Sequence, residues 1–322
     1  MSNSATLAVR VARRQREAVD IDSFELIAAD GSGLPPFSAG SHVDVHLPGG
    51  LLRQYSLCNP PDESHRYQIA VLRDPQSRGG SAAVHAQLQE GTLLQISEPR
   101  NHFALAHDAR RHLLLAGGIG VTPILCMAER LQHIGADYEM HYCTRSADRT
   151  AFADRIRNAA LGARVAFHFD DGAPEQKLDL QRLLGQPQDG THLYVCGPKG
   201  FMDAVLGTAR ASGWIESQLH YEFFSAKVEA SEADAAFEVV VASTGRVIPV
   251  AKAQTVVQAL SAAGVDVQVA CEQGVCGTCL TRVIEGVPDH KDVYLTDEER
   301  AANDQFTPCC SRSKSARLVL DL

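Results

Sequence analysis

The chain has 322 residues, of which 45% are apolar and 21% are charged, and its formal net charge is −9. This length allows two or three domains, each with its own core, and the negative charge argues against a general nucleic-acid or anionic-membrane partner. No apolar run approaches the roughly 20 residues that cross a bilayer, and the nine cysteines lack the paired spacings of a disulfide scaffold. We therefore expect a cytoplasmic protein that does not act at a membrane.

The first residues are predicted to form a strand and not a targeting segment. The start, MSNSATLAVRVARRQREAVD, lacks the apolar stretch of a secretory signal. The segment is rich in arginine, as transit peptides also are. However, Leu7, Val9 and Val11 alternate with smaller or charged residues, as in a strand.

Short segments of alternating apolar residues continue as far as residue 108. They cover residues 7–11, 24–28, 42–47, 67–72 and 92–96. Turns rich in glycine and proline, such as GSGLPP and LPGG, separate them. This pattern predicts an antiparallel β-barrel or sandwich.

Two further segments of this block carry residues suited to a flat, charged cofactor. In Arg53-Gln54-Tyr55-Ser56-Leu57, a strand would place Arg53 and Tyr55 on one face. Arg78-Gly79-Gly80-Ser81 combines a guanidinium, glycines that permit close approach and a hydroxyl, ahead of a helical turn. These groups bind phosphates, although either segment alone is more often ordinary surface.

Residues from about 110 to 226 alternate between apolar runs and helical stretches. The runs cover residues 112–118, 138–144, 164–169 and 192–197. Such alternation is typical of a parallel sheet with crossover helices.

The first of these runs ends in a glycine-rich turn. Gly117, Gly118 and Gly120 precede Thr122-Pro123. Pro123 suits the first turn of a helix, and Thr122 can cap that helix. The glycines would let backbone N–H groups approach a pyrophosphate at the helix N-terminus, although a tight turn without a ligand has the same pattern.

A second junction of this kind follows the last run. The strand ends at Gly197-Pro198, and the next helix has Phe201, Met202, Val205 and Ala209 on one face. Two such junctions in one parallel sheet can frame a dinucleotide. Cys196 lies at that edge, either beside a nicotinamide or as a small buried strand residue.

The C-terminal block follows a small, charged segment that we interpret as a linker, residues 228–236. Predicted strands at 237–243 and 246–250 and a helix at 255–264 indicate a compact α+β domain.

Four cysteines of this block, Cys271, Cys276, Cys279 and Cys309, have the C-x4-C-x2-C…C spacing of a plant-type [2Fe–2S] cluster. Gly274 and Gly277 would supply the sharp turns between them, and the loop would point backbone N–H groups at the sulfurs. A structural zinc site is the alternative. We interpret Cys310 as a packed neighbour.

The order of these motifs resembles one family. RQYSL, RGGS, GGIGVTP, CGPKGFM, YEFF and the cysteine loop occur along the chain in this order. This combination resembles the phthalate dioxygenase reductases, the single-chain reductases of Rieske-type aromatic oxygenases and O-demethylases. The resemblance covers essentially the whole chain.

The resemblance implies a multidomain fold. Residues 1–108 would form an FMN-binding antiparallel β-barrel, and residues 109–227 an α/β parallel-sheet domain that binds NAD(H). After the linker at 228–236, residues 237–322 would form an α+β, β-grasp ferredoxin domain of the plant type.

The resemblance also implies roles for single residues. Tyr55 would lie beside the isoalloxazine, Arg53 near the FMN phosphate, Cys196 near the nicotinamide, and Phe224 over the flavin face that the nicotinamide must reach. From the sequence alone, Phe224 is equally well a core aromatic. The full sets implied are Arg53, Tyr55, Ser56, Leu57, Arg78, Gly79, Gly80 and Ser81 for FMN, Gly117, Gly118, Gly120, Thr122, Pro123, Gly197 and Pro198 for NADH, and Cys271, Cys276, Cys279 and Cys309 for the cluster.

The implied activity is an electron relay. NADH gives up two electrons at once, whereas a [2Fe–2S] cluster accepts one at a time, so a flavin is needed between them. The expected path runs from NADH through FMN and the cluster to a terminal Rieske-type oxygenase, which docks transiently on a monomeric reductase.

Alternatives are an FAD-containing relative that serves a di-iron or other monooxygenase, and a non-enzymatic iron–sulfur module that senses redox state. NADPH is a further alternative to NADH, because Arg145 follows the second strand of the parallel sheet, where a 2′-phosphate needs a cation.

Overall fold

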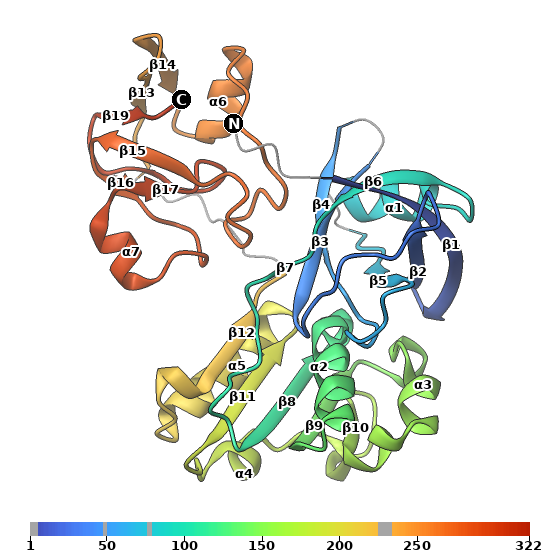
Figure 1. The fold of residues 1–322 in the computed structure, drawn as a ribbon. Helices are drawn as coiled ribbons and strands as arrows, with labels where there is room; N and C mark the ends of the chain where they lie inside the picture. Colours follow the sequence, from blue (N-terminus) through green and yellow to red (C-terminus); the bar gives the residue numbers. More distant parts are fainter. Residues whose placement is uncertain (1–5, 48–49, 76–78, 225–233) are drawn as a thin grey trace. The chain divides into compact units, whose positions relative to one another are not determined.

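The computed structural model describes residues 6–47, 50–75, 79–224 and 234–322 (Figure 1). The chain divides into two compact units, residues 1–224 and residues 225–322. Within the predicted linker, residues 228–233 lie outside the described residues, whereas Asp234 forms an ion pair with Lys291 of the second unit.

The first sheet is antiparallel and curled. Its strand order is β4-β3-β6-β1-β2-β5, with β7 paired to β3. A bridge between Leu57 and Ile69, directly after β4 and inside β5, brings the two ends of this order together. The bounds are β1 Thr6–Ala18, β2 Ile21–Ala28, β3 Ser41–His46, β4 Leu52–Ser56, β5 Tyr67–Leu72, β6 Leu93–Ser97 and β7 Arg100–Asn101, with helix α1 at Gly80–Gln87. The predicted antiparallel architecture is confirmed.

The second sheet is parallel, as predicted. Its strand order is β10-β9-β8-β11-β12. The strands are β8 Arg111–Gly117, β9 Asp137–Thr144, β10 Val165–Phe169, β11 Thr191–Cys196 and β12 Leu219–Glu222; the helices are α2 Val121–His133, α3 Ala153–Asn158, α4 Leu180–Leu184 and α5 Lys199–Ala211. Helix α5 buries Met202, Val205 and Ala209, which confirms the predicted apolar face.

Alternate side chains of β8 bury opposite faces of this sheet. Leu114 and Ala116 pack with α2, whereas Leu113 and Leu115 pack with α4 and α5. The α2 side also includes Ile21 and Ala70 of the first sheet, and Cys58 from the segment after β4. One continuous core therefore joins the two sheets into a single unit.

The second unit has a mixed five-stranded sheet of order β14-β13-β19-β15-β17. Its elements are β13 Phe237–Val241, β14 Arg246–Val250, α6 Val256–Ala262, β15 Thr281–Glu285, β16 Pro288–Asp289, α7 Asp297–Ala302, β17 Gln305–Phe306, β18 Arg312–Ser313 and β19 Arg317–Leu320. Thr255 and Gln258 form a capping box that starts α6. The unit has its own apolar core, which includes Val239, Leu260 and Leu318.

Candidate functional site

The predicted flavin strand and the predicted phosphate loop meet in the structure. Arg53 lies on β4, and Gly80 is the first residue of α1. A Cβ atom at Gly80 would come within 2.3 Å of Arg53 Nε, so only glycine lets the guanidinium lie against the start of this helix. Helix N-termini and guanidinium groups both bind phosphate. This cradle therefore fits the phosphate of a flavin.

The other residues of these two segments take distinct places. Tyr55 packs on the core of the curled sheet, and burial raises its pKa. Leu57 is fully buried. Gly79 has a φ of 96°, which favours glycine, and Ser81 Oγ accepts a hydrogen bond from the Asp74 N–H at 3.2 Å. Arg78 lies outside the described residues.

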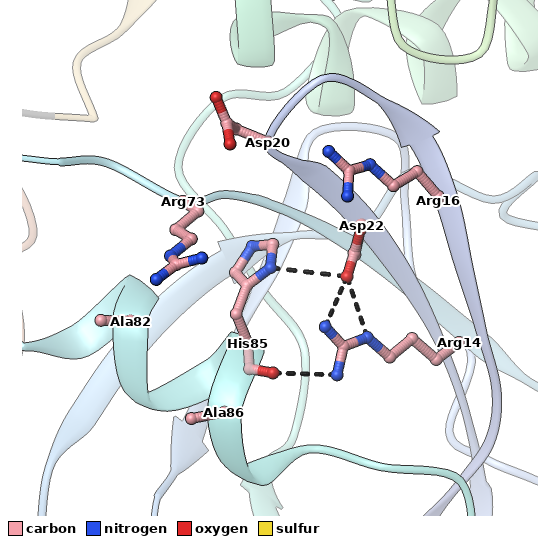
Figure 2. A pocket seen from close by; sticks show the side chains of 8 residues that line it. All are labelled: Arg14, Arg16, Asp20, Asp22, Arg73, Ala82, His85 and Ala86. Atoms are coloured by element: carbon pink, nitrogen blue, oxygen red, sulfur yellow. Dashed lines mark hydrogen bonds and ion pairs between the residues drawn. The ribbon is translucent and has the colours of Figure 1, made fainter.

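The far end of α1 is clamped by Arg14 of β1 (Figure 2). Its Nη1 donates to the carbonyl oxygens of His85 and Leu88 at 2.9 and 3.3 Å, and its Nε and Nη2 donate to Asp22 at 2.9 and 2.6 Å. His85 Nδ1 lies 3.4 Å from the same carboxylate. These groups border a cavity of about 210 Å³. No local sequence pattern predicts this clamp, since its members are up to 74 residues apart.

Replacing Arg14 with alanine is expected to lower the free energy of unfolding by about 2 kcal/mol, because the buried Asp22 loses its guanidinium partner and keeps the His85 ring beside it, and two carbonyls at the end of α1 lose their donor. Trp214, the single tryptophan, lies in the first unit and reports its unfolding in urea. Arg16→Ala is the matched control, since Arg16 lines the same cavity but donates to the Ala18 carbonyl oxygen of its own strand. Equal losses in both variants would contradict the clamp.

The two glycine junctions of the parallel sheet lie in contact. A Cβ atom at Gly117 would come within 2.8 Å of the Phe201 ring and 3.0 Å of Pro198, and one at Gly120 within 2.3 Å of the Cys196 carbonyl oxygen. Close approach of these turns therefore requires glycine. Adjacent strand ends in parallel sheets are where dinucleotides bind.

The remaining residues of the junctions lie in the same region. A Cβ atom at Gly197 would come within 3.0 Å of Gly117, and Gly118 has a φ of 53° in a short 3₁₀ turn over Gly118–Gly120.

One detail of the first junction differs from the prediction. The expected capping of the helix by Thr122 is wrong, because the 3₁₀ turn runs directly into α2, which begins at Val121 with Gly120 at its N-cap. Thr122 is therefore already helical, and its hydroxyl donates to the Ile119 carbonyl at 3.1 Å. Pro123 lies in the first turn, as predicted.

The ends of β4, β11 and β12 come together around a carboxylate. Glu222 is the neighbour of Cys196 across two parallel strands, and Ser56 Oγ donates to its Oε2 at 3.3 Å. The carboxyl end of Glu222 is enclosed, although the residue as a whole is partly exposed, and this burial raises its pKa to about 7 against the Ser56 hydrogen bond. Burial likewise holds the pKa of Cys196 well above its usual range.

Phe224, predicted to cover the flavin, ends the described part of the first unit and is 37% exposed. Glu222 belongs to the YEFF motif, and no role was predicted for it. A carboxylate between aromatic residues was the available signal, while its contact with Ser56, 166 residues away, was not visible.

Replacing Glu222 with glutamine is expected to change how stability depends on pH. The raised pKa means that the folded chain holds this proton up to about pH 7, whereas the unfolded chain loses it near 4.5. The wild type should therefore lose up to about 3 kcal/mol relative to Glu222→Gln as the pH rises from 4.5 through 7. Urea unfolding at pH 5 and pH 8, followed by Trp214 fluorescence, measures this difference. A difference that does not change with pH would refute it.

The four predicted cluster ligands converge in the second unit. Cys271 lies within hydrogen-bonding reach of Cys276 and Cys309, and Cys309 within reach of Cys279 and Cys310. Cys279 and Cys309 are buried, and Cys271 and Cys276 are partly exposed. Among the described residues, no group of three or more His, Cys, Asp or Glu side chains is arranged around a single metal ion. Cluster ligation by these four thiols stays a prediction.

The loop around them has the predicted turns. Gly274 and Gly277 have φ values of 71° and 67°, and a Cβ atom at Gly274 would come within 2.5 Å of Cys310 Sγ. Cys310 therefore packs against the loop. The Gln273 N–H donates to Cys271 Sγ at 3.3 Å, as expected for a loop that faces an anionic cluster.

Residues 239–314 match the family model of the 2Fe-2S iron-sulfur cluster binding domain. Residues 96–219 match the model of the dimethylamine monooxygenase subunit DmmA-like N-terminal domain. The vanillate O-demethylase oxidoreductase of Pseudomonas sp. (strain HR199 / DSM 7063) is 57% identical over 95% of this chain and 96% of its own length, and that of Pseudomonas putida is 56% identical over 97% and 98%.

The solved structure of phthalate dioxygenase reductase, described as a modular structure for electron transfer from pyridine nucleotides to [2Fe–2S], has a TM-score of 0.78 to this chain. The two are 37% identical over 99% of this chain and 98% of that one. The chain belongs to the phthalate dioxygenase reductase family. As a member of this family it is an oxidoreductase, the electron-transfer reductase component of an oxygenase system, with a [2Fe–2S] domain.

Membership in the phthalate dioxygenase reductase family confirms the predicted fold class: a curled antiparallel sheet, a parallel-sheet domain and a ferredoxin domain. Over the described ranges, no helix combines the length and apolar character needed to span a bilayer.

Proposed function

We propose that this chain carries electrons from NADH through FMN and a [2Fe–2S] cluster to a Rieske-type aromatic oxygenase or O-demethylase. One observation supports this most: the end of the flavin strand at Ser56 meets the nucleotide junction at Cys196 and Glu222 within one unit. Residues 1–108 would hold the flavin, 109–227 the nucleotide and 237–322 the cluster.

The cradle of Arg53, Gly80 and the α1 N-terminus would hold the flavin phosphate, with Arg78, Gly79 and Ser81 completing it. Tyr55, Ser56 and Leu57 would flank the ring. When bound, the flavin supplies the means to accept two electrons together and release them singly.

The two glycine junctions would hold NADH. Their close contact at Gly117, Gly120 and Gly197 supports this, because such glycine turns at the start of a helix would let a pyrophosphate approach the backbone. Gly118, Thr122, Pro123 and Pro198 would line the same site, with Cys196 beside the nicotinamide and Phe224 over the flavin.

Cys271, Cys276, Cys279 and Cys309 would hold the cluster, from which electrons leave the chain. The acceptor would be an oxygenase component that docks transiently on a monomeric reductase. The vanillate O-demethylase relatives favour an O-demethylase as this acceptor.

Anaerobic addition of NADH to the purified protein tests the proposal. The flavin absorbance should bleach, and electrons should then reach an added iron–sulfur oxygenase. Absence of flavin absorbance, or of bleaching, would refute the reductase function and favour a redox-sensing module. Mass spectrometry of the released flavin distinguishes FMN from the FAD of related reductases.

NADH is expected to be preferred to NADPH. The Asp170 and Asp171 N–H groups donate to the Thr144 and Arg145 carbonyl oxygens at 3.0 and 3.2 Å, which places two aspartate residues beside the end of β9. A 2′-phosphate at this strand end would meet their negative charge, which outweighs the single Arg145 cation. The ratio of kcat/KM for NADH to that for NADPH should exceed ten, and Asp170→Asn with Asp171→Asn should lower it severalfold. An unchanged ratio would contradict this assignment.

A further inference from the structure

Arg155 of α3 connects the exit of the flavin strand with the nucleotide-binding helix. Its Nε and Nη2 donate to the two carboxylate oxygens of Glu129 on α2, at 2.9 and 2.7 Å. Its Nη1 donates to Gln68 Oε1 of β5 at 2.8 Å, and Nη2 also donates to the Cys58 carbonyl at 3.0 Å. One guanidinium therefore binds helix α2, strand β5 and the segment that follows β4.

The contacts of Arg155 lie in the core that joins the two sheets. Cys58 is fully buried and Gln68 is 7% exposed. The side chains of Arg155 and Glu129 are 26% and 12% exposed. Burial raises the pKa of Glu129, and Arg155 opposes that rise. A carboxylate buried this far needs its cation, so the pair has little freedom to move apart.

Both ends of this connection lead to the proposed reaction site. Cys58 directly follows Ser56 and Leu57, and its N–H donates to the Gln68 carbonyl at 2.8 Å, which fixes this segment on β5. Glu129 lies on α2, the helix that begins after Gly120. Arg155 therefore links the segment after the flavin strand to the helix that follows the glycine turn.

We propose that Arg155 is a positioning residue that sets the nicotinamide site against the flavin site for hydride transfer. The proposal rests on the proposed function. In the proposed reaction, one hydride would pass from NADH to the flavin, so that the nucleotide would be oxidised and the flavin reduced by two electrons. Arg155 takes no part in that step; it fixes the distance over which the hydride moves, and small misplacements slow such steps strongly.

Rapid mixing of each variant with NADH, without oxygen, distinguishes an effect on the relative position of the two cofactors from an effect on their binding. Arg155→Ala should lower the limiting rate of flavin bleaching at least tenfold, while the dissociation constants of NADH and FMN change less than threefold. Arg155→Lys should lie in between, because one ammonium can pair with Glu129 but cannot also reach Gln68 and Cys58 as a planar fork. Arg157→Ala is the control on the same helix, since Arg157 contacts Asp154 and the Phe167 ring within its own domain.

Hydrogen exchange of the apoprotein gives a second readout that needs no cofactor. Exchange at the Cys58 amide and in residues 127–131 should be at least tenfold faster in Arg155→Ala than in the wild type or Arg157→Ala. A limiting rate within twofold of wild type, with only a lower Tm, would overturn the proposal.

Two further outcomes are informative. If Arg155→Ala fails to fold, Arg155→Lys and Glu129→Gln replace it, because both keep the size of the side chain. Their limiting rates of flavin bleaching are then measured, and wild-type rates in both variants would overturn the proposal. If NADH does not bleach the flavin absorbance of the wild type, the proposed function fails. If amide hydrogen exchange in Arg155→Lys is the same as in the wild type, the proposed role of Arg155 in joining the two sites is overturned.

Discussion

Replacing Cys276 with serine should abolish electron delivery to an iron–sulfur-dependent acceptor, by at least a hundredfold, and leave NADH oxidation by a flavin-level dye within twofold of wild type. Serine removes a thiolate from the loop on which the predicted cluster depends. The first unit should keep its activity, because the second unit has a separate core. Steady-state rates with the oxygenase and with the dye measure both halves of the relay.

Cys310→Ser is the matched control for this experiment. Cys310 is adjacent to a predicted ligand but packs against Gly274. This variant should retain the [2Fe–2S] absorbance and both activities. Equal loss of the two activities in Cys276→Ser would argue against a serial path from flavin to cluster. Loss of the cluster in Cys310→Ser as well would argue that the ligand set is wrong.

Local features of the chain could be predicted from the sequence. The strands of the curled sheet alternate apolar and polar residues, and the parallel strands are continuous apolar runs, so their periodicity identifies them. The cysteine loop is similar: the spacing of Cys271, Cys276 and Cys279, with Gly274 and Gly277 between them, specifies the turns that the structure shows.

Contacts between distant segments could not be predicted in this way. The contact of Gly80 with Arg53, the Ser56–Glu222 hydrogen bond and the four bonds of Arg155 depend on tertiary packing, which a linear pattern does not encode. Short β12 carries no long apolar run, so its strand was not predicted. The error at Thr122 has a related cause, since a cap residue and a residue of the first turn share the same local sequence.

Gly120→Ala should have the largest effect on the nucleotide-binding region. Its Cβ would lie 2.3 Å from the Cys196 carbonyl oxygen and 2.6 Å from the Gly197 nitrogen. Both are backbone atoms at the end of a buried strand, so they cannot turn away as a flexible side chain would. The two junctions must therefore separate, which should cost about 1–3 kcal/mol of stability and raise the NADH dissociation constant at least tenfold.

Gly207→Ala on α5 provides the control for this prediction. Apart from its chain neighbours and its own helix backbone, no atom of the described residues lies within 4 Å of a Cβ atom at Gly207, and alanine favours the helix by up to about 1 kcal/mol. Urea unfolding followed by Trp214 fluorescence measures the stability. Titration of the oxidised protein with a nonreactive analogue of NADH measures the nucleotide affinity. Wild-type stability and nucleotide affinity in Gly120→Ala would show that the junctions can separate freely. The close contact between the strand ends would then not be what shapes the dinucleotide site.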